Sequence, residues 1–395
     1  MQVESIKTTR NVAIVYADAA SGSRSAATAL QKVLQSQQPH CRVRLVNITE
    51  IFDHHRLFGK LIRSSIHYFN WQLKRDRSFD LRGLINGTLF AHDLIGRNGI
   101  RKMAAFWQSF YPDVIVSVTP LFNPVLYRSA MEVNPGVQCI TIPVNFNEVC
   151  SRYWFTPKVK QYYLNATEQL QQQAAKAGIP EQYRFRITGL PVDESAYEPA
   201  PADRHFQLRS IGLNPEWPVA LISFGAQGSH KIRAVVHALA KQHRQLNLII
   251  LCGKNKRSFR KITALQLPLP TAVYSYLHQS PILFLHLSDL VIGKAGAMTI
   301  SEALITQKPL IALRSRSMRP LQKAQEDWLT QTGTGLVAAT PSKIAQAVTA
   351  VMTNETYKHN MQEHSHKAIY EAAAFIERIG KLNQVQRLRV NKMMS

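Results

Sequence analysis

The chain has 395 residues, which at roughly 150 residues per domain suggests two or three domains. Apolar residues make up 45% and charged residues 18%, a composition that excludes a disordered chain and is typical of a globular protein with a core. Lys and Arg total 48 against 25 Asp and Glu, a formal net charge of +23. Unless it is a general solubility adaptation, this surplus indicates an anionic partner: nucleic acid, an anionic bilayer or acidic small molecules.

Export, membrane-spanning and metal-binding signals are weak. The N-terminal residues lead directly into a strand-like run, so we expect no secretory signal. No stretch reaches the roughly 18 uninterrupted apolar residues of a spanning helix. The four cysteines form no C-x-x-C pair and have no histidine at metal-ligand spacing, so we expect buried thiols in a reducing compartment and no metal site. They are Cys41, Cys139, Cys150 and Cys252.

The first half of the chain alternates strand and helix signals. Strands are predicted at Asn11–Ala17, Cys41–Ile48, Asp113–Thr119 and Val137–Val144, with a helix between the first two. Such alternation favours βαβ units and a parallel sheet. We therefore predict an N-terminal Rossmann-like domain over residues 1–200, followed by a linker at Pro199–His205.

The alternation then restarts. Strands are predicted at Trp217–Gly225, Leu246–Gly253, Asp289–Lys294, Pro309–Leu313 and Gly335–Ala339, with a helix over His230–Gln242. This pattern predicts a second Rossmann-like domain over residues 205–365 and a helical tail over 366–395. The predicted class is α/β, with two doubly wound domains and a ligand between them at the carboxyl ends of the strands.

Residues 52–110 interrupt the first domain with a basic, aromatic segment. Apolar residues recur near helical spacing from Leu57 to Leu73, and six basic residues accompany one acid between Arg56 and Arg77. A core-facing helix with a solvated basic side is one interpretation. The other is a helix that lies in an anionic membrane surface through Arg63, Trp71, Lys74 and Arg75.

The segment GKAGAMTISEA, Gly293–Ala303, carries the strongest chemical signal. A strand ends at Gly293, small residues follow, and a helix is expected to begin near Met298 and Thr299. Backbone amides at a helix N-terminus bind phosphate, and the helix dipole favours the anion. In this interpretation Lys294, Gly296, Ala297, Met298 and Thr299 surround phosphate, Ser301 adds a hydroxyl, and Glu302 accepts hydrogen bonds from a ribose diol. The alternative is an ordinary strand–helix junction.

Three further turns could take part in the same site. Gly225, Gly228 and Ser229 lie in the first strand–helix turn of the second domain, and Gly253 and Asn255 end its next strand. The spacing matches neither a Walker loop nor a full G-x-G-x-x-G motif, so the signal is their convergence on one sheet edge. The first domain has a similar turn around Gly22, with Asp18, Ser23 and Arg24 as its polar groups.

These motifs resemble those of bacterial and plastid glycosyltransferases that make glucosyl- and galactosyl-diacylglycerol. They are also similar to the peptidoglycan enzyme that adds N-acetylglucosamine to a lipid-linked precursor. The resemblance lies at Asp289–Pro309, Arg186–Asp193, Tyr153–Pro157 and the glycine turns. It implies the GT-B fold, a UDP-sugar as co-substrate with no cofactor or metal, and a lipid acceptor on the first domain. It also implies that Gln322 and Gln325 face the sugar and that Trp154 lies on the acceptor side.

This chain lacks the acid–base residues of the family pattern. Ser23 stands where the family has a histidine, and Asn145 replaces an aspartate that follows a later strand. A serine hydroxyl is a poor base at neutral pH, and an amide cannot take a proton. Glu148, Asp18 and His92 remain as candidate acids or bases.

The function implied is an inverting glycosyltransferase that moves a hexose or N-acetylhexosamine from a UDP-sugar to a membrane lipid. The protein would be cytoplasmic and bound peripherally to the inner face of an anionic membrane. The alternatives are a nucleotide-sugar-binding protein with weak or lost catalysis, and a UDP-sugar epimerase of the same fold. No nucleic-acid motif accompanies the positive charge, so no nucleic-acid partner is expected.

Overall fold

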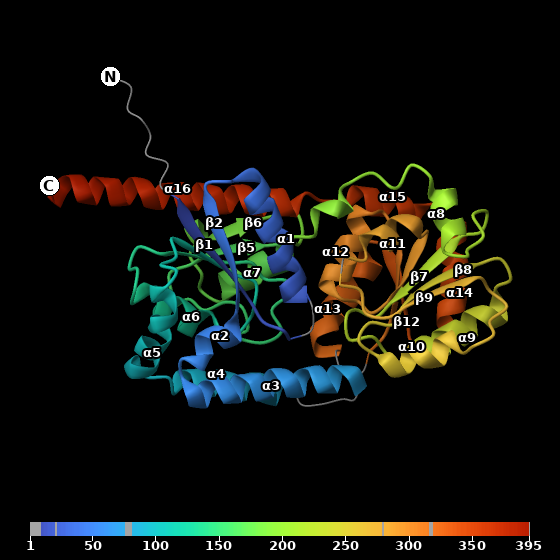
Figure 1. The fold of residues 1–395 in the computed structure, drawn as a ribbon, viewed down its shortest axis with the longest axis horizontal. Coiled ribbons are helices and arrows are strands. Elements are labelled where there is room, and N and C mark those ends of the chain that lie inside the picture. The colour runs from blue at the N-terminus through green and yellow to red at the C-terminus, as the bar shows by residue number, and fades with distance from the viewer. Residues whose placement is uncertain (1–8, 20–21, 76–80, 279, 316–318, 395) are drawn as a thin grey trace, which may run out of the picture.

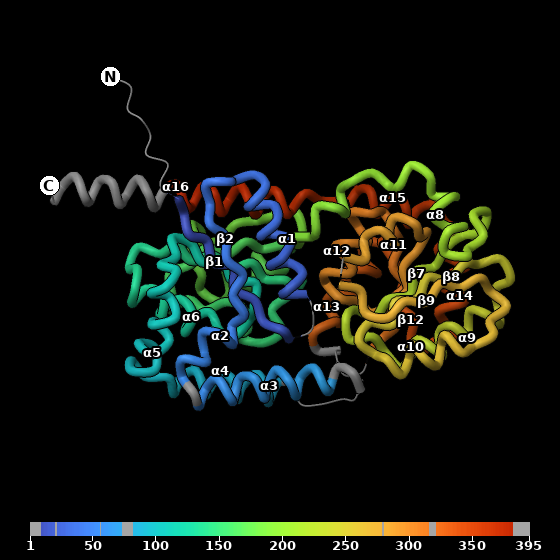
Figure 2. The backbone as a smooth tube through the Cα atoms, in the orientation of Figure 1, coloured from blue at the N-terminus to red at the C-terminus, as the bar shows by residue number. Residues whose placement is uncertain are grey.

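The computed structural model describes residues 9–19, 22–75, 81–278, 280–315 and 319–394, and Figures 1 and 2 trace its path. Two six-stranded sheets, each flanked by helices, lie side by side. Every strand pair in both sheets is parallel. This arrangement confirms the predicted α/β class with two parallel-sheet units.

The first sheet has the order β2-β1-β3-β4-β5-β6. Its central strands are buried apolar runs, as a parallel sheet covered on both faces requires. Its strands are β1 Arg10–Tyr16, β2 Cys41–Asn47, β3 Val114–Ser117, β4 Gln138–Thr141, β5 Tyr162–Asn165 and β6 Arg184–Arg186. Its helices are α1 Gly22–Gln37, α6 Asn123–Met131 and α7 Glu168–Lys176, with α2 to α5 inserted between β2 and β3.

The second sheet has the order β12-β11-β10-β7-β8-β9. Its strands are β7 Val219–Ser223, β8 Asn247–Leu251, β9 Thr271–Tyr274, β10 Leu290–Gly293, β11 Leu310–Leu313 and β12 Gly335–Ala338. Its helices are α8 Arg204–Ser210, α9 Ile232–Gln242, α10 Lys256–Thr263, α11 Ile282–Leu287, α12 Ala297–Ile305, α13 Arg319–Gln331, α14 Pro341–Thr353 and α15 Thr356–Glu363.

The chain crosses between the two sheets twice. The first crossing follows β6, and the second leads into α16, Ala368–Met394, which returns to the first sheet (Figure 2). The Arg10 guanidinium donates to the carbonyl of Glu377 at 3.2 Å, and Thr188 donates to the Glu371 carboxylate. The segment predicted as a tail is therefore joined to the first sheet.

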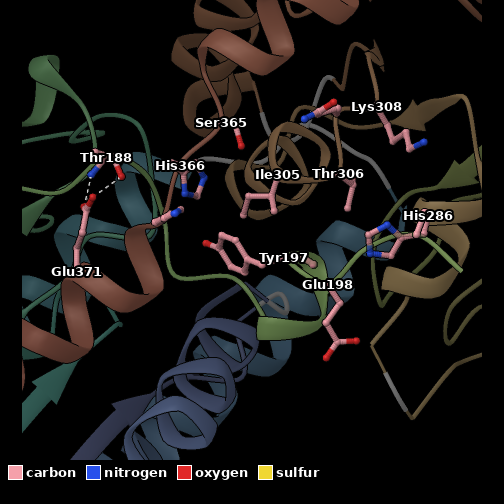
Figure 3. A pocket seen from close by; sticks show the side chains of 14 residues that line it. Thr188, Tyr197, Glu198, His286, Ile305, Thr306, Lys308, Ser365, His366 and Glu371 are labelled. Carbon is pink, nitrogen blue, oxygen red and sulfur yellow. Dashed lines mark hydrogen bonds between the residues drawn. The ribbon is translucent and has the colours of Figure 1, made fainter. Parts of the chain in front are cut away.

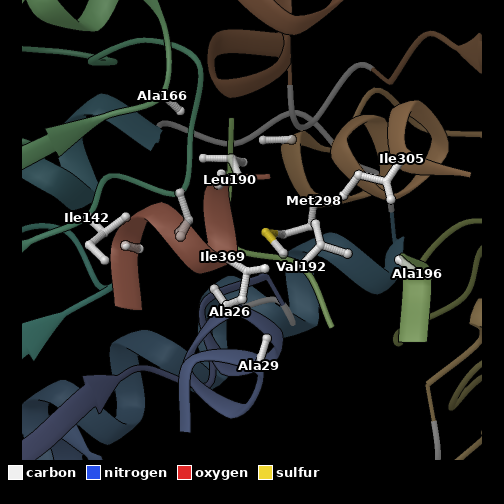
Figure 4. Close-up of a cluster of buried hydrophobic side chains, with 14 of the residues drawn as sticks. Ala26, Ala29, Ile142, Ala166, Leu190, Val192, Ala196, Met298, Ile305 and Ile369 are labelled. Atoms are coloured by element: carbon white, nitrogen blue, oxygen red, sulfur yellow. The ribbon is translucent and has the colours of Figure 1, made fainter. Parts of the chain in front are cut away.

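One buried apolar cluster runs between the two sheets (Figure 4). Ala26 and Ala29 of α1 meet Met298 and Ile305 of α12 in it, together with Ile369 of α16. Burial of this shared surface holds the N-terminal ends of α1 and α12 close to each other, which positions the site described below.

The basic insert forms α2 Ile48–Asp53, α3 Arg56–Arg75, α4 Leu81–Asp93 and α5 Arg97–Gln108. In Figure 1, α3 and α4 run along the lower edge of the molecule and reach beneath α13. Leu321 of α13 packs with Ile85 and Leu89 of α4, and Phe69 of α3 lies against this cluster. The insert therefore contacts both halves of the protein.

The predicted strands before residue 145 and after residue 217 match observed strands to within a few residues, but three strands were missed. These are β5, β6 and β9, which have only three or four residues each. β6 and β9 are edge strands, of which β6 carries two arginines and β9 is only partly buried, whereas β5 lies between β4 and β6. Such short strands lack the long apolar run on which the predictions depended.

Candidate functional site

Two glycine turns interlock at the carboxyl edge of the second sheet. Gly225, Gly228 and Gly253 have positive φ angles of 79°, 67° and 58°. A Cβ atom on Gly228 would lie 2.0 Å from the Cys252 carbonyl oxygen, and one on Gly253 would lie 2.5 Å from that of Ala226. Only glycine fits either position, so the turns after β7 and β8 form one close-packed backbone surface.

The polar side chains in these turns support the backbone. Asn255 caps α10 by accepting from the Ser258 amide at 2.9 Å, and Ser229 accepts from the Lys231 amide at 3.1 Å. The Ser258 hydroxyl donates to the Ser229 carbonyl at 3.1 Å. The structure thus places Ser229 and Asn255 beside the predicted donor site and gives their side chains a local bonding role.

The N-terminus of α12 lies next to these turns. Gly296 is the N-cap residue, with no side chain to cap the first turn, so the helix presents backbone N–H groups there. A Cβ atom on Gly225 would lie 3.4 Å from Cε and 3.5 Å from Nζ of Lys294, so that lysine extends over the Gly225 turn. Ala297 begins the helix, and Thr299 lies near Gly296. Ser301 is buried, which contradicts its predicted contact with phosphate.

Glu302 has an unusual electrostatic environment. Burial, and secondarily the Asp193 carboxylate, raise the pKa of Glu302 to about 7. Asp193 itself accepts from Lys32 at 2.7 Å and from the Ser195 hydroxyl at 2.7 Å. Its burial opposes ionisation, but these bonds outweigh it and lower the pKa of Asp193. The sequence did not assign Asp193 and Lys32 to this site, because segments distant in the chain bring them there.

Gln322 and Gln325 project from α13 as buried side chains, each with about 3% of its surface exposed. The Oε1 atom of each lacks a hydrogen-bond partner within the described structure. A buried acceptor without a partner costs about 1–3 kcal/mol. Hydroxyl groups of a bound sugar would remove this cost, and the role of both residues in sugar binding stays a prediction.

The first domain meets α12 through Gly22. A Cβ atom on Gly22 would lie 3.2 Å from Cγ of Met298, so the N-termini of α1 and α12 face each other. Both helix dipoles point their positive ends into this junction. The structure thus brings Gly22 together with the predicted donor residues.

Ser23 is buried and bonded rather than free to act. Its hydroxyl donates to the Val118 carbonyl at 2.8 Å and accepts from the Ala17 amide at 3.2 Å. Its proton is therefore committed to a carbonyl, and it joins the ends of β1 and β3. This bonding argues against the catalytic role that the family's histidine position implies for Ser23.

We predict that Ser23→Ala destabilises the protein and leaves its chemistry intact. Losing the hydroxyl leaves a buried amide and a buried carbonyl without this partner, at a cost of about 1–3 kcal/mol. Denaturant unfolding should show that loss, and kcat measured on the folded fraction should stay within about twofold of the wild type. A fall in kcat with unchanged stability would restore Ser23 as a catalytic group.

Glu148 and Trp154 lie in the loop between β4 and β5 and help to hold its conformation. Glu148 accepts from the backbone amides of Trp154 and Phe155 at 3.2 Å each, although burial raises its pKa. Trp154 is fully buried, which contradicts its predicted place on the acceptor or membrane surface. Asn145 precedes Phe146, whose ring packs 5.1 Å from that of Trp328 on α13. Asn145 is thus placed at the junction with the second domain.

The two remaining acid–base candidates, His92 and Asp18, differ in their exposure to solvent. His92 is buried between Phe52 and Phe122, and burial lowers its pKa to about 4. The side chain of Asp18 is 38% exposed, directly after β1, and pairs with Arg24. Asn47 donates to this carboxylate at 2.9 Å, and Asn70 of α3 donates to the Asp18 carbonyl at 2.6 Å. Asp18 therefore combines a partly exposed carboxylate with a fixed position.

The predicted membrane residues lie on α3. Arg63 is exposed and pairs with Asp53, and Trp71 stacks on Tyr68 with ring centroids 6.1 Å apart. The side chains of Lys74 and Arg75 lie outside the described residues. None of the helices in the described ranges is both long enough and apolar enough to cross a bilayer.

Two family models match complementary parts of this chain. Residues 219–379 match the glycosyltransferase family 28 C-terminal domain, and residues 92–192 match monogalactosyldiacylglycerol (MGDG) synthase. The second match begins within the insert and ends beside Asp193, while the first contains all the donor turns.

Curated relatives agree with these matches. A processive diacylglycerol beta-glucosyltransferase of Staphylococcus saprophyticus is 27% identical over 67% of this chain and 66% of its own length. A probable chloroplastic monogalactosyldiacylglycerol synthase of Nicotiana tabacum is 25% identical over 86% of this chain and 64% of its own length. The chain thus spans slightly less than two thirds of the length of these relatives.

Solved structures share the fold. The glycotransferase of kitacinnamycin has a TM-score of 0.59 at 16% identity, covering 93% of this chain and 98% of that one. MurG of Acinetobacter baumannii has a TM-score of 0.57 at 15% identity, covering 93% of this chain and 99% of that one. Together these findings confirm the predicted GT-B fold, in a chain whose residues 219–379 and 92–192 match the glycosyltransferase family 28 C-terminal domain and monogalactosyldiacylglycerol synthase.

Proposed function

We propose that this protein transfers a hexose from a UDP-sugar to diacylglycerol with inversion at the anomeric carbon. One observation supports the UDP-sugar site. At a single sheet edge, the interlocked glycine turns lie beside the open N-terminus of α12, with Lys294 and Glu302. The lipid acceptor is supported by the relatives named as diacylglycerol and monogalactosyldiacylglycerol enzymes. An N-acetylhexosamine donor is the less favoured alternative, because those two names specify glucose and galactose.

In the proposed reaction the acceptor hydroxyl attacks the anomeric carbon from the face opposite to UDP. The leaving diphosphate gains negative charge, which the backbone N–H groups of α12, its dipole and Lys294 would stabilise. We propose that these groups act without a metal ion. Glu302 would hold the ribose, and Gln322 and Gln325 would bind sugar hydroxyls. The turns position the donor, so that attack becomes effectively intramolecular.

We propose Asp18 as the base that takes the acceptor proton. Ser23, Glu148 and His92 are each bonded or enclosed, whereas Asp18 is partly exposed at the edge where the first domain meets α12. Arg24 pairs with its carboxylate and Asn47 donates to it, which holds the carboxylate in position. Asp18→Asn should lower kcat by about 10²–10⁴-fold and leave UDP affinity unchanged. Asp18→Glu should recover part of the rate. A normal kcat in Asp18→Asn would refute the assignment.

The insert presents an apolar edge suited to a membrane surface. Leu57 and Leu61 of α3 are 73% and 50% exposed, and Phe90 and Leu94 at α4 are 65% and 64% exposed. Exposed lysines and arginines accompany them, including Lys60, Arg97 and Arg101. We propose that this edge lies on the anionic leaflet that holds the acceptor, since basic amphipathic helices bind there.

Replacing Leu57 and Leu61 with serine should weaken binding to vesicles containing an anionic phospholipid by at least about tenfold, because each leucine contributes up to about 1.5–3 kcal/mol when buried in lipid. Both residues are exposed, so the fold and UDP affinity should not change. Phe206→Ser on α8 is the matched control, since Phe206 is 59% exposed on the second domain. Equal vesicle binding of the double variant and the control would contradict this docking edge.

A further inference from the structure

A hollow of about 760 Å³ lies where the chain crosses between the two domains. It is lined by the first crossing, at Thr188 and Tyr197, and by the second, at Ser365 and His366 (Figure 3). The C-terminal end of α12 and the following turn complete it with Thr306 and Lys308. The glycine turns and Glu302 do not line it, so it is separate from the donor site.

His366 carries a hydrogen-bond donor that lacks an acceptor. The side chain has only 5% of its surface exposed, and burial lowers its pKa to about 4, so the ring is neutral at pH 7. The Ala368 amide donates to Nδ1 at 3.5 Å, which places the ring proton on Nε2. Nε2 has no partner within the described structure. A buried donor of this kind needs an acceptor, such as an oxygen of a ligand or water.

The ring of His366 also packs directly against the first crossing. A Cβ atom on Gly189 would lie 2.4 Å from Cδ2 of His366, so any other residue at position 189 would displace the ring. A ligand bonded to Nε2 would therefore contact both crossing segments. Its binding would restrict how the two domains move relative to each other.

Two lysines and two glutamates line the hollow. The lysines are Lys308 and Lys367. Burial lowers the pKa of Lys308, the nearby Asp289 opposes this shift, and the cations Arg204 and Lys358 add to it. The Glu371 carboxylate is occupied, because it accepts from the Thr188 amide at 2.7 Å and hydroxyl at 2.8 Å. Glu198 is exposed, and Figure 3 shows its carboxylate directed away from His366.

From this geometry we propose that the hollow binds a small soluble molecule through an oxyanion group, a phosphate or a carboxylate. The Nε2–H group of His366 donates to it, and Lys308 and Lys367 neutralise its charge, which gives charge-assisted hydrogen bonds. The crossings lie on the side of the molecule opposite α3 (Figure 1), so a bilayer resting on α3 would not present its headgroups there. The site would regulate the opening between the domains.

Titration calorimetry of the full chain with inorganic phosphate and with glycerol 3-phosphate, at matched ionic strength in chloride, tests this site. The double variant Lys308→Met and Lys367→Met should weaken binding at least tenfold. The control Lys241→Met and Lys343→Met removes the same charge from exposed lysines of the second domain and should stay within about twofold of the wild type. His366→Phe, which keeps a ring but removes the donor, should also weaken binding. If it fails to fold, the lysine variants decide.

Hydrogen exchange identifies the source of the anion and the consequence of binding. Inorganic phosphate should slow exchange in residues 187–200 and 364–368 of the wild type, and vesicles of an anionic phospholipid should not. Protection by vesicles alone would replace the soluble ligand with a lipid headgroup and overturn the proposal. Phosphate binding that survives unchanged in the Lys308 and Lys367 double variant would place the anion elsewhere, for example at α12, and would also overturn it.

Discussion

Glu302→Gln should weaken UDP binding about 10–100-fold at pH 8 while making the protein more stable at that pH. An ionised carboxylate that accepts from a ribose diol contributes about 1.5–3 kcal/mol per bond, and a neutral amide contributes less. The matched control is Glu181→Gln, an exposed glutamate of the first domain. Calorimetry with UDP measures the affinity, and denaturant unfolding measures the stability.

The stability gain follows from the raised pKa of Glu302. Its folded pKa is about 7 against a usual value of 4.5, so ionising it costs the folded state free energy. The cost is absent below about pH 4.5, grows as the pH rises toward 7 and is fully present above it. Removing it should stabilise the glutamine variant by about 1–3 kcal/mol at pH 8 and not at pH 4, the lower end allowing for partial solvent access.

The same pKa predicts how UDP affinity depends on pH. In the free protein Glu302 is largely protonated below pH 7. Wild-type affinity should therefore rise as the pH passes through 7, and Glu302→Gln should lose this dependence. A variant that binds UDP as tightly as the wild type at pH 8 would contradict the ribose assignment.

Gly228→Ala should destabilise the protein by more than about 2 kcal/mol and remove most UDP binding. The residue has a φ of 67°, and a Cβ atom there would lie 2.0 Å from the Cys252 carbonyl oxygen. A positive φ alone costs a non-glycine residue about 1–2 kcal/mol, and the backbone contact forces the turns after β7 and β8 apart. Thermal unfolding and UDP calorimetry measure the two effects.

Gly87→Ala is the matched control for that variant. Gly87 lies within α4, and a Cβ atom there would meet nothing within 4 Å. Alanine is the better helix former, so this change should stabilise the protein by about 0.5–1 kcal/mol. If the two alanine variants behave alike, the interlocked turns do not shape the donor site.

The sequence was sufficient for the fold class and for the convergence of the glycine turns at one sheet edge, because both depend on local patterns. Buried apolar runs marked β7, β8 and β10, and small residues marked the turns that end them. The carboxyl ends of parallel strands meet at one edge, so the convergence of Gly225, Gly253 and Gly296 followed from topology alone.

The contacts between distant segments could not be predicted in the same way. Asp193 reaches Glu302 and Lys32 only through packing of the first crossing against α1 and α12. Ser23 sits at a motif position, yet its bonds to Ala17 and Val118 depend on the spacing of β1 and β3. The family resemblance placed Trp154 on the acceptor side, whereas packing in the core of the fold buries it completely.

The most direct test of the proposed function is a transfer assay with the wild-type chain. UDP-glucose and UDP-galactose are each incubated with vesicles containing diacylglycerol and an anionic phospholipid, in the presence of a chelator, and lipids and UDP are quantified together. The proposal predicts a β-linked hexosyl-diacylglycerol, formed in equal amount with UDP. UDP binding without any lipid product would show a binding protein that has lost catalysis, and UDP release that does not need the lipid would show an epimerase or hydrolase instead.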